Sequence, residues 1–190
     1  MLRGHRAEPS VPVSVVPPPP ERVDPLYRDG ERAALEAWLE LHRLTLWHKC
    51  AGLSAGQLGE RSVPPSLLSL RGLVRHMTDV ELGWFRRVFA GEDAEDRYET
   101  PEDPDRAFTG FSSGDPAEVA AEWAGFQAEL DRCRAVAAAH DLDDLSARAT
   151  RLSGEHMTLR WVLLHLIEEY ARHNGHADLL RERIDGATGV

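Results

Sequence analysis

Cysteine is scarce in this chain of 190 residues, which holds only Cys50 and Cys133. The two residues lie far apart in the sequence and form no CxxC pair, which argues against a zinc ribbon and against a disulfide framework. Cys133 has the spacing of a core residue, so we expect a buried structural thiol there and not a nucleophile. Both cysteines are typical of reduced thiols in a cytoplasmic protein.

Long apolar runs and an excess of basic charge are absent as well. No apolar run approaches the ~20 residues of a transmembrane helix, and the first six residues lack the apolar segment of a secretion signal. Acidic residues outnumber basic ones, 32 against 22, for a formal net charge of -10. Nucleic acids and anionic membranes both require a basic face. We therefore expect neither a nucleic-acid nor a membrane partner, and a cytoplasmic location.

The composition is otherwise that of an ordinary globular domain, with 42% hydrophobic and 28% charged residues. Such a chain can bury one full core. Residues 1–28 contain the run Pro17 to Pro20, which cannot form a helix, and we expect a disordered or extended arm there. Leu26 and Tyr27 are the side chains that we expect to anchor the arm. Residues 29–190 then form the folded domain.

Apolar residues recur at the 3–4 residue spacing of amphipathic helices throughout this domain. Capping signals accompany the pattern: Ser66 or Ser69 begins the second helix, Asp115 and Pro116 begin the third, and Thr158 begins the fourth. The four predicted helices span about 29–52, 66–91, 115–140 and 158–186. Four long helices with no convincing strand predict an all-α four-helix bundle. The acidic, Gly- and Pro-rich segment 91–114 predicts a long loop, which is a lid, a crossover or solvated surface, the last being favoured.

The last helix carries polar groups on a face that its apolar neighbours predict to be buried. At about 100° per residue, this face collects eight side chains: Val162, His165, Leu166, Glu169, Arg172, His173, His176 and Leu180. Burying charged groups without partners costs several kcal/mol each. A metal ion is the most specific candidate for a partner that would compensate these buried groups.

Glu169 and His173 are spaced i, i+4, so their side chains lie one turn apart and can hold one ion. A third ligand must come from another helix, and His76 borders the apolar stripe of the second helix. Two imidazoles and one carboxylate suit zinc, nickel, iron(II) or manganese. Three protein ligands leave coordination positions open, as in catalytic sites. The remaining positive charge would attract an anionic ligand such as a thiolate or hydroxide.

Other roles for the same polar groups remain open from spacing alone. His165 could replace His76 as a ligand or hydrogen-bond to Glu169, and His176 could act likewise. Arg172 could pair with Glu81 or hold a substrate carboxylate. A metal-free core of hydrogen bonds among these Glu, Arg and His side chains is the alternative to a metal site.

Two stretches resemble a known family: LVRHMTDVELGWF around His76 and HLIEEYARHNGH from His165 onward. They are similar to the DinB-like superfamily of bundle metalloproteins, and the resemblance covers about residues 24–188. The ending from Arg172 resembles the mini-circle-protein branch. In the superfamily the usual ligands are one His of the second helix and an HxxxH pair of the last. Glu169 departs from that pattern and is similar to the His–Glu–His variant of mycothiol-dependent maleylpyruvate isomerases.

The resemblance implies an enzyme that binds a divalent metal at His76, Glu169 and His173, with zinc preferred over nickel, iron and manganese. It implies a low-molecular-weight thiol of the mycothiol type as co-substrate, attacking an electrophile in S-transfer or isomerisation. No catalytic residue is expected beyond the metal, and a homodimer is plausible. Two alternatives are kept. One is a metal-dependent hydrolase or oxygenase, with Glu81 or His165 as the general base of hydrolysis. The other is a non-catalytic binding or scaffolding bundle.

Overall fold

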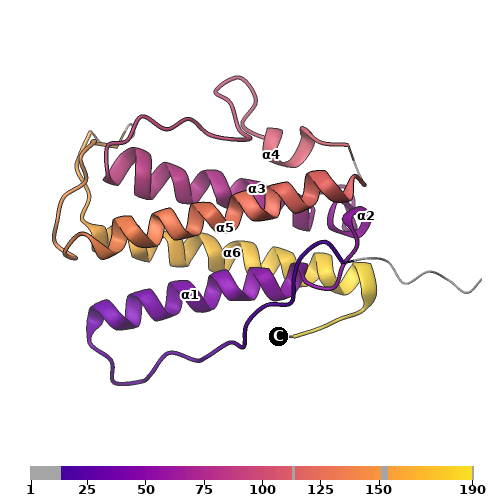
Figure 1. Cartoon of the computed structure of the whole chain (residues 1–190), viewed down its shortest axis with the longest axis horizontal. Coiled ribbons are helices and arrows are strands. Elements are labelled where there is room, and N and C mark those ends of the chain that lie inside the picture. Colours follow the sequence, from indigo (N-terminus) through magenta and orange to yellow (C-terminus); the bar gives the residue numbers. More distant parts are fainter. Residues whose placement is uncertain (1–13, 113, 151–153, 190) are drawn as a thin grey trace, which may run out of the picture.

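The computed structural model describes residues 14–112, 114–150 and 154–189, in which the chain forms six α-helices and one π-helix. Four long helical segments lie side by side (Figure 1). They are α1 (Glu31–Cys50), α3 (Leu70–Glu81) continued by the π-helix η1 (Leu82–Phe89), α5 (Pro116–Ala138) and α6 (Leu159–Asp185). Two short helices, α2 (Ala55–Leu58) and α4 (Arg106–Thr109), lie in the connections. The described residues contain no strand, so the predicted all-α bundle is confirmed.

The capping residues predicted from the sequence begin the helices. The Ser69 side chain accepts a hydrogen bond from the Gly72 N–H, and the Thr158 side chain accepts one from the Trp161 N–H. Asp115 caps α5 in the same way, ahead of Pro116. Each such cap contributes about 1 kcal/mol by satisfying a free N–H group of the first turn. α6 ends at Asp185 and is followed by Gly186, whose φ of 79° is the left-handed conformation that glycine adopts without strain.

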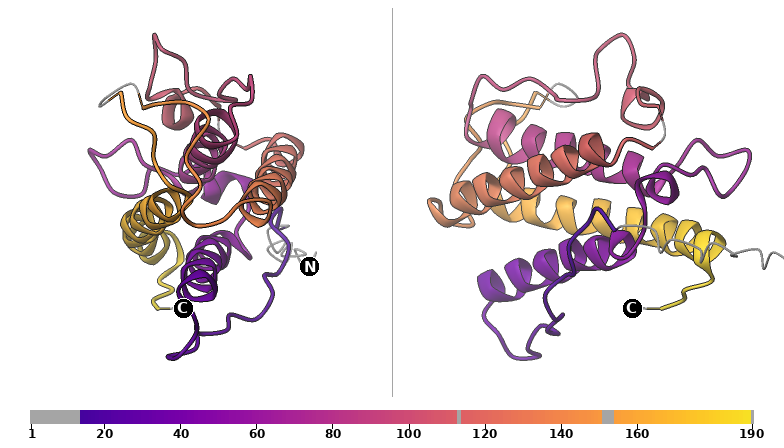
Figure 2. Two further views of the ribbon diagram at one scale, coloured as in Figure 1. Left: turned by 90° about the vertical axis from the view of Figure 1, so that its left-hand side faces the viewer. Right: turned by 45° about the vertical axis from the view of Figure 1, so that its right-hand side comes forward.

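The helices pair as α1 with α6 and α3 with α5, and α3 also contacts α6 (Figure 2). Their apolar faces share one core, to which the four helices contribute Leu39, Leu46, Leu73, Met77, Phe126, Leu130, Leu166 and Tyr170. Within the described residues, no helix is long and apolar enough to cross a bilayer. The contact between α3 and α6 matters most for the site, because it joins the two helices that carry the predicted ligands.

The second half of the predicted helix 66–91 packs differently from the prediction. The 3–4 spacing of its apolar residues continues through Trp84 and Val88 and places them on the core face, whereas the structure fully buries Phe85 and Phe89 and leaves Trp84 and Val88 partly buried. The cause is the π-helix η1, in which the Ala90 N–H donates to the carbonyl of Phe85, five residues back. This wider turn moves the core stripe to a four-residue spacing and turns Trp84 and Val88 toward the loop that follows.

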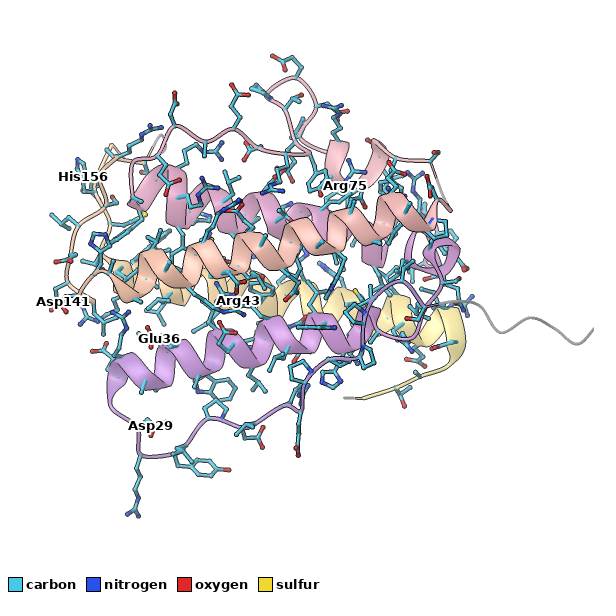
Figure 3. All side chains as sticks on the ribbon, in the orientation of Figure 1. Asp29, Glu36, Arg43, Arg75, Asp141 and His156 are labelled. Carbon is cyan, nitrogen blue, oxygen red and sulfur yellow. The ribbon has the colours of Figure 1, made fainter. Side chains whose placement is uncertain are left out.

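A buried ion pair ties three helices together. The Arg43 guanidinium of α1 donates to both carboxylate oxygens of Glu81, at 2.7 and 2.6 Å. The Tyr170 hydroxyl of α6 donates to the same carboxylate at 2.9 Å. Arg43 lies between α1 and α5 in Figure 3, and Glu81 is fully buried. Of the two roles left open for Arg172, the pairing with Glu81 does not occur, because Arg43 and Tyr170 bind this carboxylate.

The described part of the N-terminal arm, residues 14–28, is extended and runs along α1 (Figure 1). Val16 inserts into the core and is only 3% exposed. Leu26 and Tyr27 are exposed instead, so the expectation that they anchor the arm is wrong. The remainder of the arm, residues 1–13, lies outside the described residues.

The segment between η1 and α5 is fastened to the bundle. The buried carboxylate of Asp79 accepts the backbone N–H groups of Arg97, Tyr98 and Glu99 at 2.7 to 2.9 Å. Arg97 in turn reaches Glu129 of α5. In Figure 1 the segment lies along the outer side of α3. Residues 91–106 are all half-buried or exposed, so the segment is surface, as favoured from the sequence, and residues 97–99 are fastened to α3.

Candidate metal centre

Three side chains meet where α3 and α6 pack together. His76 comes from α3, and Glu169 and His173 come from successive turns of α6. One ligand atom from each residue lies within 4.8 Å of the others. The Nε2 atom of His173 is 3.5 Å from a Glu169 oxygen, and the two imidazole ring centroids are 4.9 Å apart. These are the three residues that the sequence predicts as ligands.

The three side chains are neither deeply buried nor free in solvent. Their exposed fractions are 20% for His76, 19% for Glu169 and 12% for His173. Such a position shields the donors from bulk water while leaving one side of the group within reach of a small ligand. It matches a site with open coordination positions better than a closed structural one.

Each imidazole contacts a further side chain through its Nδ1 atom. The Nδ1 of His76 lies 2.6 Å from a carboxylate oxygen of Glu99, and the Nδ1 of His173 lies 3.3 Å from the Nδ1 of His176. A carboxylate bonded to one ring nitrogen fixes the orientation of the ring and leaves the other nitrogen for a metal. His76 is thereby set to offer Nε2, and the Nε2 of His173 already faces Glu169.

Burial is the main influence on the protonation of His173. Burial, together with the neighbouring His76, His176 and Arg172, lowers the pKa of His173 to about 4. The imidazole is therefore neutral near pH 7, which is the form that binds a metal. Glu169 complements it as the only carboxylate of the three.

Glu99 is a site residue that the sequence reasoning missed. It lies in the long acidic segment, where no periodicity distinguishes it from the other acidic side chains. The available signal was Asp79, an acidic residue on the face that α3 buries. Asp79 binds the Glu99 N–H and so places the Glu99 side chain beside His76.

Three further side chains of α6 were predicted to lie near the ligands, and the structure places each of them differently. His165 lies beside Glu169, with its Nε2 3.9 Å from Oε1 of that carboxylate, and its ring stacks on Trp161. His176 touches His173, as described above. Arg172 is 60% exposed and lies 3.6 Å from Glu168. It therefore points away from Glu81.

The donor set fits a divalent ion. Two neutral imidazole nitrogens and one carboxylate oxygen are ligands common to zinc, nickel, iron(II) and manganese. The carboxylate balances one of the two charges of such an ion. The Nδ1 contact of His76 with the Glu99 carboxylate is of the kind that metal-binding histidines generally make.

Neither cysteine of the chain belongs to this group. Both Cys50 and Cys133 are free and fully buried in the core. Burial raises the pKa of Cys50 to about 12 and the pKa of Cys133 still further. The predicted burial of Cys133 is confirmed. Since the thiolate is the reactive form of cysteine, neither residue is suited to act as a nucleophile.

Of the comparisons with known proteins, the one with family models identifies the family of this chain. A comparison with curated proteins found no match. The family model described as mycothiol-S-transferase matches residues 34–186, a span that runs from α1 to the end of α6 and includes all three residues of the metal group. The resemblance to DinB-like proteins drawn from the sequence is confirmed by this match. The chain belongs to the mycothiol S-transferase family, a DinB-like family.

Proposed function

We propose that this protein is a metal-dependent S-transferase that joins the sulfur of mycothiol to an electrophile. One observation carries the proposal: His76, Glu169 and His173 bring three donor atoms within 4.8 Å of one another in a chain of this family. Since both cysteines are buried in the core, the sulfur nucleophile comes from outside the protein.

The chain's own residues prepare the site for such a thiol. When bound, a divalent ion supplies a positive centre that lowers the pKa of an incoming thiol. Glu169 would offset part of the positive charge of the ion. The positive charge that remains would still attract an anionic ligand. His173 stays neutral because it is buried. Glu99 holds the ring of His76 through Nδ1. The thiol gives up its proton to the solvent, its sulfur forms a bond to the electrophilic carbon, and the leaving group departs with its electron pair.

Metal content is the first test of this proposal. We expect about one divalent ion per chain in the purified protein, with zinc as the expected metal and nickel, iron or manganese as alternatives. The variants His76→Ala and His173→Ala should each lose most of it, because two remaining donors bind weakly. His140→Ala is the matched control, because His140 is an exposed residue that contacts Asp144. Full metal occupancy in both site variants would sink the proposed ligand set.

Thiol dependence is the second test. Conjugation of a model electrophile such as 1-chloro-2,4-dinitrobenzene should require both mycothiol and the bound metal. Product formation is followed by absorbance. Turnover of an ester or amide substrate with no thiol present would instead support a metal-dependent hydrolase.

A further inference from the structure

A cavity of about 420 Å³ lies between the α3–η1 segment and the loop that follows it. The helix contributes one wall, which includes Val80 and Trp84. The loop contributes the opposite wall, which includes Asp96 and Glu99. Its volume is within the range of ordinary small-molecule sites.

Two side chains that line the cavity contact the metal group or its neighbour His165. Glu99 lines the cavity and bonds to His76 at 2.6 Å. Trp84 lines it as well and packs edge-on against the ring of His165, with centroids 4.6 Å apart. His165 in turn lies beside Glu169. The cavity is therefore separated from His76 by the side chain of Glu99 and from His165 of α6 by that of Trp84.

The π-helix gives this cavity its lining. The wider turn of η1 sends Phe85 and Phe89 to the core and leaves Trp84, Arg87 and Val88 on the loop side. In a regular α-helix the stripe predicted from the sequence would have buried Trp84 and Val88. The π-helix η1 therefore places the indole of Trp84 and the guanidinium of Arg87 in the wall of the cavity.

The charged side chains that line the cavity already form bonds within the protein, and among them Arg148, from the connection between α5 and α6, donates to the Gly91 carbonyl at 3.0 Å. Arg87 donates to both oxygens of Asp96, at 2.9 and 2.7 Å. Asp79 accepts three backbone N–H groups, and Glu99 is bonded to His76. A carboxylate offers about four lone-pair positions and a guanidinium five N–H groups. These groups therefore keep hydrogen-bonding capacity for a ligand without presenting one dominant charge.

The polar lining of the cavity favours one of the two substrates of the proposed reaction over the other. An apolar electrophile would strip water from the paired charges and return no hydrogen bonds, which costs free energy. A ligand rich in hydroxyl groups can both donate to the carboxylates and accept from the guanidinium. The indole of Trp84 offers a flat apolar surface to the C–H groups of such a ligand.

We propose that this cavity binds the hydroxyl-rich, sugar-like body of the thiol, so that its sulfur lies at the metal group and the electrophile arrives from another side. This inference rests on the proposed function, because it takes a hydroxylated thiol as the co-substrate. It adds the place of that ligand and names Trp84 and the Arg87–Asp96 pair as the groups that recognise it.

The test separates the body of the ligand from its sulfur. S-methyl mycothiol keeps the hydroxylated body but has no free thiol, and N-acetylcysteine has the thiol without the body. Calorimetric titration of metal-stripped protein should detect binding of S-methyl mycothiol. Trp84→Leu and Asp96→Asn should each raise its Kd about tenfold, equivalent to losing one or two hydrogen bonds or an aromatic contact.

The matched control is Asp131→Asn, because Asp131 also pairs with an arginine but lies on the exposed side of α5. It should bind S-methyl mycothiol like the wild type. With zinc-loaded protein, N-acetylcysteine should bind equally to the wild type and both cavity variants. Failure of S-methyl mycothiol to bind, or equal Kd values in the wild type and both cavity variants, overturns the inference. Neither result bears on the metal-content and thiol-dependence tests, so the two proposals fail separately.

Discussion

At the residue scale, the site depends on contacts between side chains that are far apart in the sequence. Glu169 and His173 share a helix, and their i, i+4 spacing alone predicted that they would meet. His76 was predicted as a partner from its place at the border of an apolar stripe. Glu99 could not be predicted, because its position depends on three backbone N–H groups of a loop converging on Asp79. Such loop geometry leaves no periodic signal in the sequence.

The role of Glu99 leads to a prediction about metal affinity. Glu99→Gln keeps the shape of the side chain but removes the charge that orients His76. We expect the dissociation constant of the metal to rise about 10- to 100-fold, the effect usual for losing such a partner. Competition with a chromogenic chelator measures it. Glu95→Gln is the control, because Glu95 is an exposed residue of the same loop. Equal metal affinity in both variants would rule out an orienting role for Glu99.

At the element scale, the four long helices could be read from the sequence, and their irregularities could not. Ser69, Asp115 and Thr158 mark helix starts by local chemistry, which a sequence displays directly. The π-helix is different, since Trp84 and Phe85 are both aromatic and either could face the core. Only the packing of α3 against α5 and α6 decides between them. The short helices α2 and α4 were missed because four residues are too few to reveal a period.

The buried pair of Arg43 and Glu81 joins α1 to α3, and Tyr170 extends it to α6. Arg43→Met would leave the Glu81 carboxylate buried without its counter-charge. We expect the free energy of unfolding to fall by about 3–5 kcal/mol, measured by urea denaturation. Arg134→Ala, which breaks a half-exposed pair with Glu40, should cost about 1 kcal/mol or less. Similar losses in the two variants would contradict the role assigned to the buried pair.

At the scale of the whole molecule, the bundle buries both of its thiols in the core. It places the three residues of the metal group where α3 and α6 pack together. Cys50 and Cys133 lie in the core with raised pKa values. We expect the native protein at pH 8 to react with 5,5′-dithiobis(2-nitrobenzoate) at a negligible rate. Denaturant should release two reactive thiols per chain. Rapid reaction of either cysteine in the folded protein would reopen the question of a protein nucleophile.

The central claim is that the metal at His76, Glu169 and His173 binds the thiol of the co-substrate. Calorimetric titration of mycothiol into zinc-loaded and metal-stripped protein tests it most directly. The thiol loses its proton on binding a metal, so zinc-loaded protein should bind at least about tenfold more tightly and release protons to the buffer. Equal affinity and no proton release in the presence and absence of zinc would contradict the claim.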